Sequence, residues 1–303
     1  MHRVLALVML LSTAAPAAAP HVCKVDSDCA SSELCDHNQC VGRGWGTARE
    51  MAEQNAGMAL GYTKHTWPLS VIDRPLVVAP GMTEAQLGIF KDLSADVAGA
   101  ALNHPLGADA YARFGVSDRI QAGLDALGVC LASCGGSGSF RGISVGAGYA
   151  ALANHDMNLV PYVSLALYNT SIPTDTRYYL PLQFGALFGW RIHSAVQLLA
   201  SGGLALGVLG RSNAFFDSPE TLSLQFGPRF EVVPRISVAP FIGYRLPFNH
   251  SELYTVPAGI ELLIVADRDV DLGAAFQFLD ITSRTVTRGT DVRAMRVFLT
   301  VRL

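Results

Sequence analysis

Residues 295–303 read Met-Arg-Val-Phe-Leu-Thr-Val-Arg-Leu, and their side chains alternate between two kinds. One alternate set is wholly apolar: Met295, Val297, Leu299, Val301 and Leu303. The other set is mostly polar or charged: Arg296, Phe298, Thr300 and Arg302. Because successive side chains of a strand point to opposite faces, the stretch predicts a strand with one apolar face and one polar face. Membrane-spanning barrels use strands of this kind, with lipid on one side and the lumen on the other.

Similar alternation recurs through residues 81–303. Three further blocks have these apolar faces: Tyr178, Leu180, Leu182, Phe184, Ala186, Phe188 and Trp190; Leu222, Leu224, Phe226, Pro228 and Phe230; and Tyr254, Val256, Ala258, Ile260, Leu262 and Ile264. The composition is 50% hydrophobic and only 16% charged, with a mean hydropathy of +0.31. No apolar run of 18 residues follows the N-terminal region, which excludes a bundle of spanning helices. Since only helices and closed barrels satisfy their backbone in a bilayer, the pattern favours a barrel.

The connections between blocks are alternately short and long. Short polar turns fall near residues 117–118, 155–158, 191–193, 233–235 and 267–269. Longer segments fall near residues 93–104, 130–139, 170–176, 207–220, 247–252 and 282–290. Outer-membrane barrels have short periplasmic turns and longer outer loops. Eleven connections predict an all-β fold over residues 80–303: a closed antiparallel up-and-down transmembrane β-barrel of about twelve strands, with both termini in the periplasm.

The C-terminal strand resembles the recognition signal at the end of bacterial outer-membrane barrels, although Leu303 stands where Phe is usual. Residues 111–124 are similar to a strand–turn–strand unit frequent in such barrels. This resemblance covers residues 81–303 and implies a porin-like transport protein in the outer membrane of a Gram-negative-type bacterium, in contact with its lipid. A soluble exported β-sandwich is the alternative fold, but its outward face should carry many Lys, and no Lys follows Lys91.

The N-terminal region divides into three parts. Residues 1–17 have the basic start, the short apolar stretch and the small-residue cleavage site of a secretory signal peptide. Residues 18–41 form a Cys-rich module, and residues 42–79 form a linker, in which residues 47–55 are compatible with a short helix, with a partial plug of the barrel or with a loosely ordered stretch. In such a helix Thr47 is the cap and Glu50 follows three residues later.

Six cysteines are expected to form disulfides in the exported chain: Cys23, Cys29, Cys35, Cys40, Cys130 and Cys134. The first four allow three pairings, and the sequence does not choose among them. Zinc bound by these four and His37 is the competing interpretation, but the spacing lacks the usual C-x2-C unit. The run resembles the first half of the Dickkopf N-terminal Cys-rich motif, which implies an interaction module. Cys130 and Cys134 are expected to pin a surface loop.

Ten charges are predicted to line the lumen: Asp109, Arg113, Asp125, Arg229, Glu231, Arg245, Glu261, Asp271, Arg296 and Arg302. The presence of both positive and negative charges is compatible with two hypotheses. The first is a narrow passive channel that filters small polar solutes. The second is a closed structural barrel, plugged by ion pairs, whose loops or Cys-rich module bind a periplasmic protein or the cell wall. Buried charges must be paired to be tolerated, which either hypothesis satisfies.

No residue pattern indicates catalysis. His193 and Ser194 are adjacent in a turn, and residues 249–252 hold Asn, His, Ser and Glu in a loop. Adjacent positions suit a working triad poorly, so a membrane hydrolase is the weakest hypothesis. We therefore expect no enzyme activity, no cofactor and no metal. The net charge of −3 disfavours nucleic acid as a partner.

Overall fold

The computed structural model describes residues 33–36, 39–42, 62–94, 105–133, 140–169, 177–213, 220–249, 251–282 and 293–303. The chain divides into two compact units, Met1–Arg49 and Glu50–Leu303. The described part of the first unit is an antiparallel hairpin of β1 (Glu33–Asp36) and β2 (Gln39–Gly42). Its register places Cys35 opposite Cys40.

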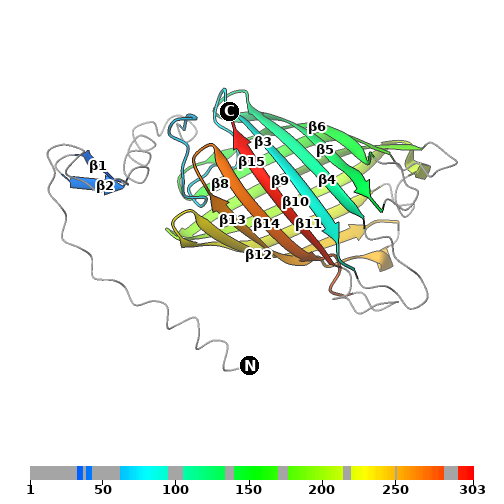
Figure 1. The fold of residues 1–303 in the computed structure, drawn as a ribbon. Helices are drawn as coiled ribbons and strands as arrows, with labels where there is room; N and C mark the ends of the chain where they lie inside the picture. The colour runs from blue at the N-terminus through cyan, green and yellow to red at the C-terminus, as the bar shows by residue number, and fades with distance from the viewer. Residues whose placement is uncertain are drawn as a thin grey trace. The chain divides into compact units, whose positions relative to one another are not determined.

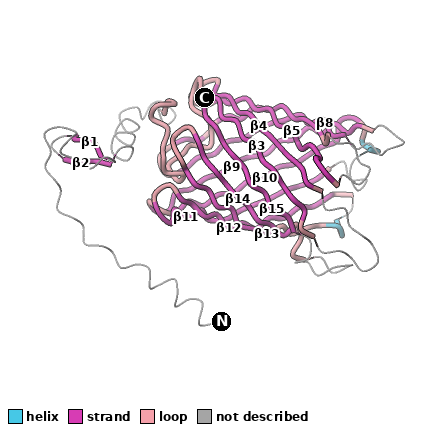
Figure 2. The backbone as a smooth tube through the Cα atoms, viewed as in Figure 1, coloured by secondary structure: helices cyan, strands magenta, loops and turns pink. Residues whose placement is uncertain are grey.

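The second unit is a closed barrel (Figures 1 and 2). Its twelve strands within the described residues are β3 (Thr83–Asp92), β4 (Leu106–Gly115), β5 (Ile120–Ala132), β6 (Gly142–Tyr149), β8 (Met157–Asn169), β9 (Tyr178–His193), β10 (Val196–Leu209), β11 (Thr221–Val233), β12 (Ile236–Pro247), β13 (Ala258–Val265), β14 (Val270–Phe278) and β15 (Arg293–Arg302). Neighbours in sequence pair antiparallel, and the pairing of β15 with β3 closes the sheet. The two-residue strand β7 (Leu152–Ala153) pairs with β8 beside the β6–β8 contact. The predicted closed antiparallel barrel of about twelve strands is confirmed.

The two ends of the barrel differ in their connections. The short turns gather at the end where the C-terminus lies (Figure 1). The longer connections include two 3-10 helices, η3 (Arg211–Asn213) and η5 (Ser251–Leu253). Among the described residues, neither of these helices approaches the length and apolar character needed to cross a bilayer.

Alternate residues of each strand face the lumen and the outer surface. On β15, Val297 and Leu299 are 46% and 39% exposed, whereas Thr300 and Arg302 are each 3% exposed. The exposed side chains form the apolar outer face that a lipid-facing barrel requires. The structure therefore confirms the two faces that the sequence predicts for this strand.

Two boundaries differ from the sequence-based expectation. β9 continues to His193, so the turn follows at residues 194–195 instead of 191–193. Arg191 belongs to the strand, because its side chain points inward and pairs with Asp73. β13 begins at Ala258 instead of residue 253. Pro257 precedes it and has no N–H group to donate to the ladder, so regular pairing starts only after it.

Residues 62–82, here called the inner segment, pack against the inside of the barrel wall. Two buried clusters join the two: Val71 with Leu263, Val265 and Phe298, and Val77 with Ala150 and Val160. A third cluster, of Trp67, Val78, Ala79 and Met82, lies within the inner segment itself. Most of the inner segment falls within the predicted linker, residues 42–79, yet its apolar side chains form core. The predicted helix at residues 47–55 lies outside the described residues.

The outward and inward positions of β11 predict opposite effects of one substitution. Phe226 points outward and is 61% exposed, and its neighbour Gln225 is exposed on the inward face. Phe226→Arg should lower the free energy of unfolding by about 2–4 kcal/mol, because it places a cation in hydrocarbon. Gln225→Arg should change it by less than about 1 kcal/mol, as at a solvated site. Denaturant unfolding in lipid vesicles measures both, and equal effects would contradict the assigned faces.

Candidate functional site

The candidate site is a cavity of about 450 Å³ inside the barrel, between the strands and the inner segment. Its wall has two chemically different sides. Polar and charged side chains from β3, β4, β14 and β15 form one side, and include Glu84, Tyr111 and Asp271. The other side, from β9 to β13, is mixed: apolar side chains such as Leu199 and Phe241 lie beside the polar Gln197, Arg229 and Glu261. A volume of this size is typical of small-molecule sites.

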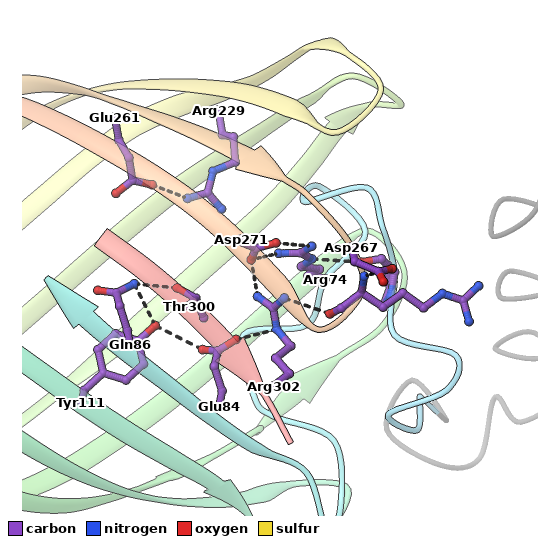
Figure 3. A network of polar contacts seen from close by, with 12 residues as sticks. Arg74, Glu84, Gln86, Tyr111, Arg229, Glu261, Asp267, Asp271, Thr300 and Arg302 are labelled. Carbon is purple, nitrogen blue, oxygen red and sulfur yellow. Dashed lines mark hydrogen bonds and ion pairs between the residues drawn. The ribbon is translucent and has the colours of Figure 1, made fainter. Parts of the chain in front are cut away.

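On the polar side, one buried carboxylate is shared by two arginines (Figure 3). Arg74 of the inner segment donates from Nη1 to Asp271 Oδ2 at 2.6 Å and from Nη2 to Oδ1 at 3.1 Å. Arg302 donates to the same Asp271 and also, from Nε, to Glu84 Oε2 at 2.9 Å. These contacts join the inner segment to both the first and the last strand of the barrel.

The hydrogen bonds continue from Glu84 along the lumen. The Tyr111 hydroxyl donates to Glu84 at 3.2 Å, and the Gln86 amide donates to Tyr111 at 3.3 Å. Arg296 donates to Gln86 at 2.6 Å and, from Nε, to Asp109 at 3.0 Å. We call this chain of contacts the ionic ladder; its members are Arg74, Asp271, Arg302, Glu84, Tyr111, Gln86, Arg296 and Asp109.

Further contacts hold the inner segment to other strands around the barrel. Asp73 pairs with Arg191 on β9, and the Ser70 hydroxyl donates to Glu231 on β11 at 2.6 Å. The Val78 N–H donates to Gln121 on β5 at 3.1 Å. Anchors on separated strands fix the segment across the short-turn end of the lumen.

Burial also affects titratable groups of the inner segment. Burial lowers the pKa of the Arg74 guanidinium below its ordinary value, and the hydrogen bond to Asp271 offsets only part of this shift. Burial, together with the nearby Asp73 carboxylate, raises the pKa of Tyr62 to about 12. Tyr62 is therefore neutral at physiological pH.

The ten charges predicted from the sequence all lie on strands of the barrel, in different environments. The cavity wall includes six of them: Arg113, Arg229, Glu261, Asp271, Arg296 and Arg302. Asp109 pairs with Arg296, Asp125 accepts from Ser144 at 2.8 Å, and Glu231 accepts from Ser70. Arg245 is exposed on β12. Arg229 and Glu261 form an ion pair at 3.2 Å.

Four charges that the structure brings into these contacts are not among the ten predicted from the sequence: Asp73, Arg74, Glu84 and Arg191. Glu84 occupies the same face of β3 as Gln86, so the alternation of that strand could have identified it. Arg191 falls in a turn predicted from the sequence, although it keeps the inward phase of β9. Asp73 and Arg74 lie in the inner segment, which has no strand period to indicate where they point.

The other predicted sites give partial observations. Cys130 is disulfide-bonded, while Cys134, Cys23 and Cys29 lie outside the described residues. No group of three or more His, Cys, Asp or Glu that could hold a metal occurs within the described ranges. The Nδ1 atom of His193 is 3.3 Å from the Ser194 hydroxyl and also accepts the Ala195 N–H at 3.3 Å, which makes it a turn contact.

Comparison with solved structures identifies the fold. The COG4313 outer membrane channel from Pseudomonas putida F1 superposes with a TM-score of 0.52 and 11% identity, over 75% of this chain and 97% of that chain. The KdgM porin in complex with disordered oligogalacturonate gives 0.47 and 11%, over 72% and 98% of the two chains. The NanC porin gives 0.47 and 10%, over 73% and 100%. No protein-family model and no curated protein sequence matches this chain. The fold and the apolar outer face are those of an outer-membrane barrel.

The ionic ladder predicts where the structure is most sensitive to loss of a charge. Asp271→Asn removes the carboxylate that Arg74 and Arg302 share, and should lower the free energy of unfolding by about 3–5 kcal/mol. Glu261→Gln is the matched change in the more exposed pair with Arg229, and should cost about 1 kcal/mol or less. Denaturant unfolding compares the two variants. Equal losses would show that the shared carboxylate has no special role.

Proposed function

We propose that the protein is a narrow outer-membrane channel for small polar solutes, constricted at its short-turn end by the inner segment. The observation that carries the proposal is the internal cavity of about 450 Å³, lined by charged and polar side chains together with apolar ones. Solute-sized space inside a closed barrel is what passage through the membrane needs. The fold shared with the Pseudomonas putida outer membrane channel supports the same function.

Inward-facing side chains are exposed near the long connections and buried near the short turns, as expected if the outer half of the lumen is open. Ser223, Gln225 and Arg245 occupy inward positions of β11 and β12, and all three are exposed. Toward the short-turn end, the inward side chains of Gln197 and Asp271 are 2% and 1% exposed. A solute entering from the long-connection side therefore meets the inner segment before it leaves. Passage requires that this segment shift or that a solute slip beside it.

The orientation of the barrel follows from its connections. Short turns of such barrels face the periplasm, so we infer that the inner segment closes the periplasmic mouth. The same orientation would place the Met1–Arg49 unit in the periplasm, where a protein or cell-wall partner is accessible to it.

One observation favours the second candidate function, a closed structural barrel. The inner segment is held by the shared carboxylate of Asp271 and by anchors to Arg191, Glu231 and Gln121. If these contacts never open, the barrel is an anchor and the loops or the N-terminal unit are the functional parts. Ion conductance distinguishes the two candidates.

Planar-bilayer recording of the folded protein is the test. The native chain should give small, discrete, salt-dependent conductance steps. The triple variant Ser70→Ala, Asp73→Asn, Arg74→Gln should give larger steps, because it removes three anchors of the inner segment. A chain without residues 18–80 should behave likewise.

His65→Gln is the matched control, since His65 is an exposed residue of the same segment. Its conductance should equal that of the native chain. Silence from the native chain, the triple variant and the shortened chain, all shown to be folded by heat-shifted gel migration, would contradict the channel and favour the closed barrel.

A further inference from the structure

Positive charge is in excess in the wall of the cavity. Three carboxylates and five arginines belong to this wall: Glu84, Glu261, Asp271, Arg74, Arg113, Arg229, Arg296 and Arg302. Arg74 and Arg302 share Asp271, and Arg302 also binds Glu84. Arg229 binds Glu261, and Arg296 binds Asp109, which is not part of the wall. Among the described residues, Arg113 is therefore the wall arginine without an ion pair.

The carboxylates on the strands beside Arg113 already have other partners. Glu84 lies directly opposite Arg113 in the β3–β4 register. Its Oε1 atom accepts from Tyr111 at 3.2 Å and its Oε2 atom accepts from Arg302 at 2.9 Å (Figure 3). Asp125 on β5 lies opposite Tyr111 and accepts from a serine hydroxyl of β6 at 2.8 Å. Neither carboxylate pairs with Arg113, so the charge of this arginine is available to a solute.

The guanidinium of Arg113 is positioned by an aromatic ring. Its Cζ atom lies over the Tyr111 ring, 4.6 Å from the ring centroid, and Tyr111 is itself held by its hydrogen bond to Glu84. Within the described part of the chain, the nitrogens of Arg113 make no hydrogen bond, and none of them is fully buried. Because contact with the face of a ring uses none of the N–H groups, these donors are open to the cavity.

Arg113 lies beside the place where the inner segment joins β4. The Gly81 N–H donates to the Gly115 carbonyl at 2.8 Å, and the Gly115 N–H donates to the Met82 carbonyl at 3.0 Å. Arg113 is the next inward residue of β4, about 6.5 Å from Gly115. Its cross-strand neighbour on β5 is Gly123, where an added Cβ would have its nearest neighbours, two backbone oxygens, at 3.9 and 4.0 Å. The lumen beside Arg113 is therefore not filled by a side chain of β5.

We propose that Arg113 binds a small organic anion with a single carboxylate, which the channel accepts where the inner segment narrows the lumen. The carboxylate accepts two N–H groups of the guanidinium, in the forked geometry that arginine offers to planar anions. One negative charge balances the one unpaired arginine. A second negative charge would gain no free arginine and would be repelled by Glu84 and Asp125 on the two neighbouring strands.

The rest of the solute lies in the cavity of about 450 Å³, where apolar side chains such as Leu199 contact its body. The inference rests on the proposed channel function and names its solute class. Binding at Arg113 can nevertheless be measured without conduction, so the two proposals can fail separately.

Titration calorimetry of the full, folded chain in an uncharged detergent tests the site, with empty micelles as the blank. Benzoate is the probe. Benzamide keeps the ring and removes the charge, and terephthalate adds a second carboxylate to the same ring. Benzoate should bind more tightly than either. Arg113→Gln should weaken benzoate binding about ten- to a hundredfold, as expected when a hydrogen-bonded charge is lost.

Arg119→Gln is the matched control, because it removes the same charge from the exposed turn between β4 and β5. It should leave benzoate binding unchanged. Arg113→Lys keeps the charge but lacks the fork, and its affinity should fall between those of the native chain and Arg113→Gln. Heat-shifted gel migration checks that each variant is folded. If Arg113→Gln does not fold, Arg113→Lys takes its place and should still bind benzoate more weakly than the native chain.

Two results would overturn the proposal: benzamide or terephthalate binding as tightly as benzoate, or equal benzoate binding by the native chain and the Arg113 variants. Conductance by a native chain that does not bind benzoate would refute the solute class and leave the channel. Benzoate binding that depends on Arg113, in a chain that conducts no ions, would refute the channel and leave the anion site.

Discussion

The carboxylate of Asp271 joins three parts of the chain that are far apart in sequence. It accepts from Arg74 of the inner segment and from Arg302 of β15, while Arg302 also binds Glu84 of β3. The barrel closes where β15 meets β3, so one ionic group fixes both the closure and the position of the inner segment. Because a buried charge without its partner is strongly unfavourable, neither part can shift alone at low cost.

This arrangement also determines what the lumen offers to a solute. Each carboxylate of the cavity wall is paired with an arginine, but the wall holds five arginines and three carboxylates, so positive charge is in excess there. Apolar side chains such as Leu187, Leu199 and Phe241 line the same cavity beside these charges, as is common in small-molecule sites.

Much of the barrel could be predicted because strand alternation is a local property. Residues 295–303 show both faces, and acids and arginines in the inward phase point to the lumen whatever their partners are. The inner segment could not be predicted in this way, since residues 62–82 have no regular period and their burial depends on the barrel around them. Arg229 and Gln197 become neighbours only through the β10–β11 register, which the sequence does not contain.

Hydrogen exchange of the folded native chain tests the central claim, that the inner segment is part of the barrel's packed interior. The backbone N–H of Arg74 donates to the Val71 carbonyl at 3.3 Å, and the backbone N–H of Val78 donates to the Gln121 side chain at 3.1 Å. If the claim holds, both amides exchange on the slow timescale of the β3 strand amides. Fast exchange throughout residues 62–82, beside protected strands, would show that the segment does not occupy the lumen and would contradict the account.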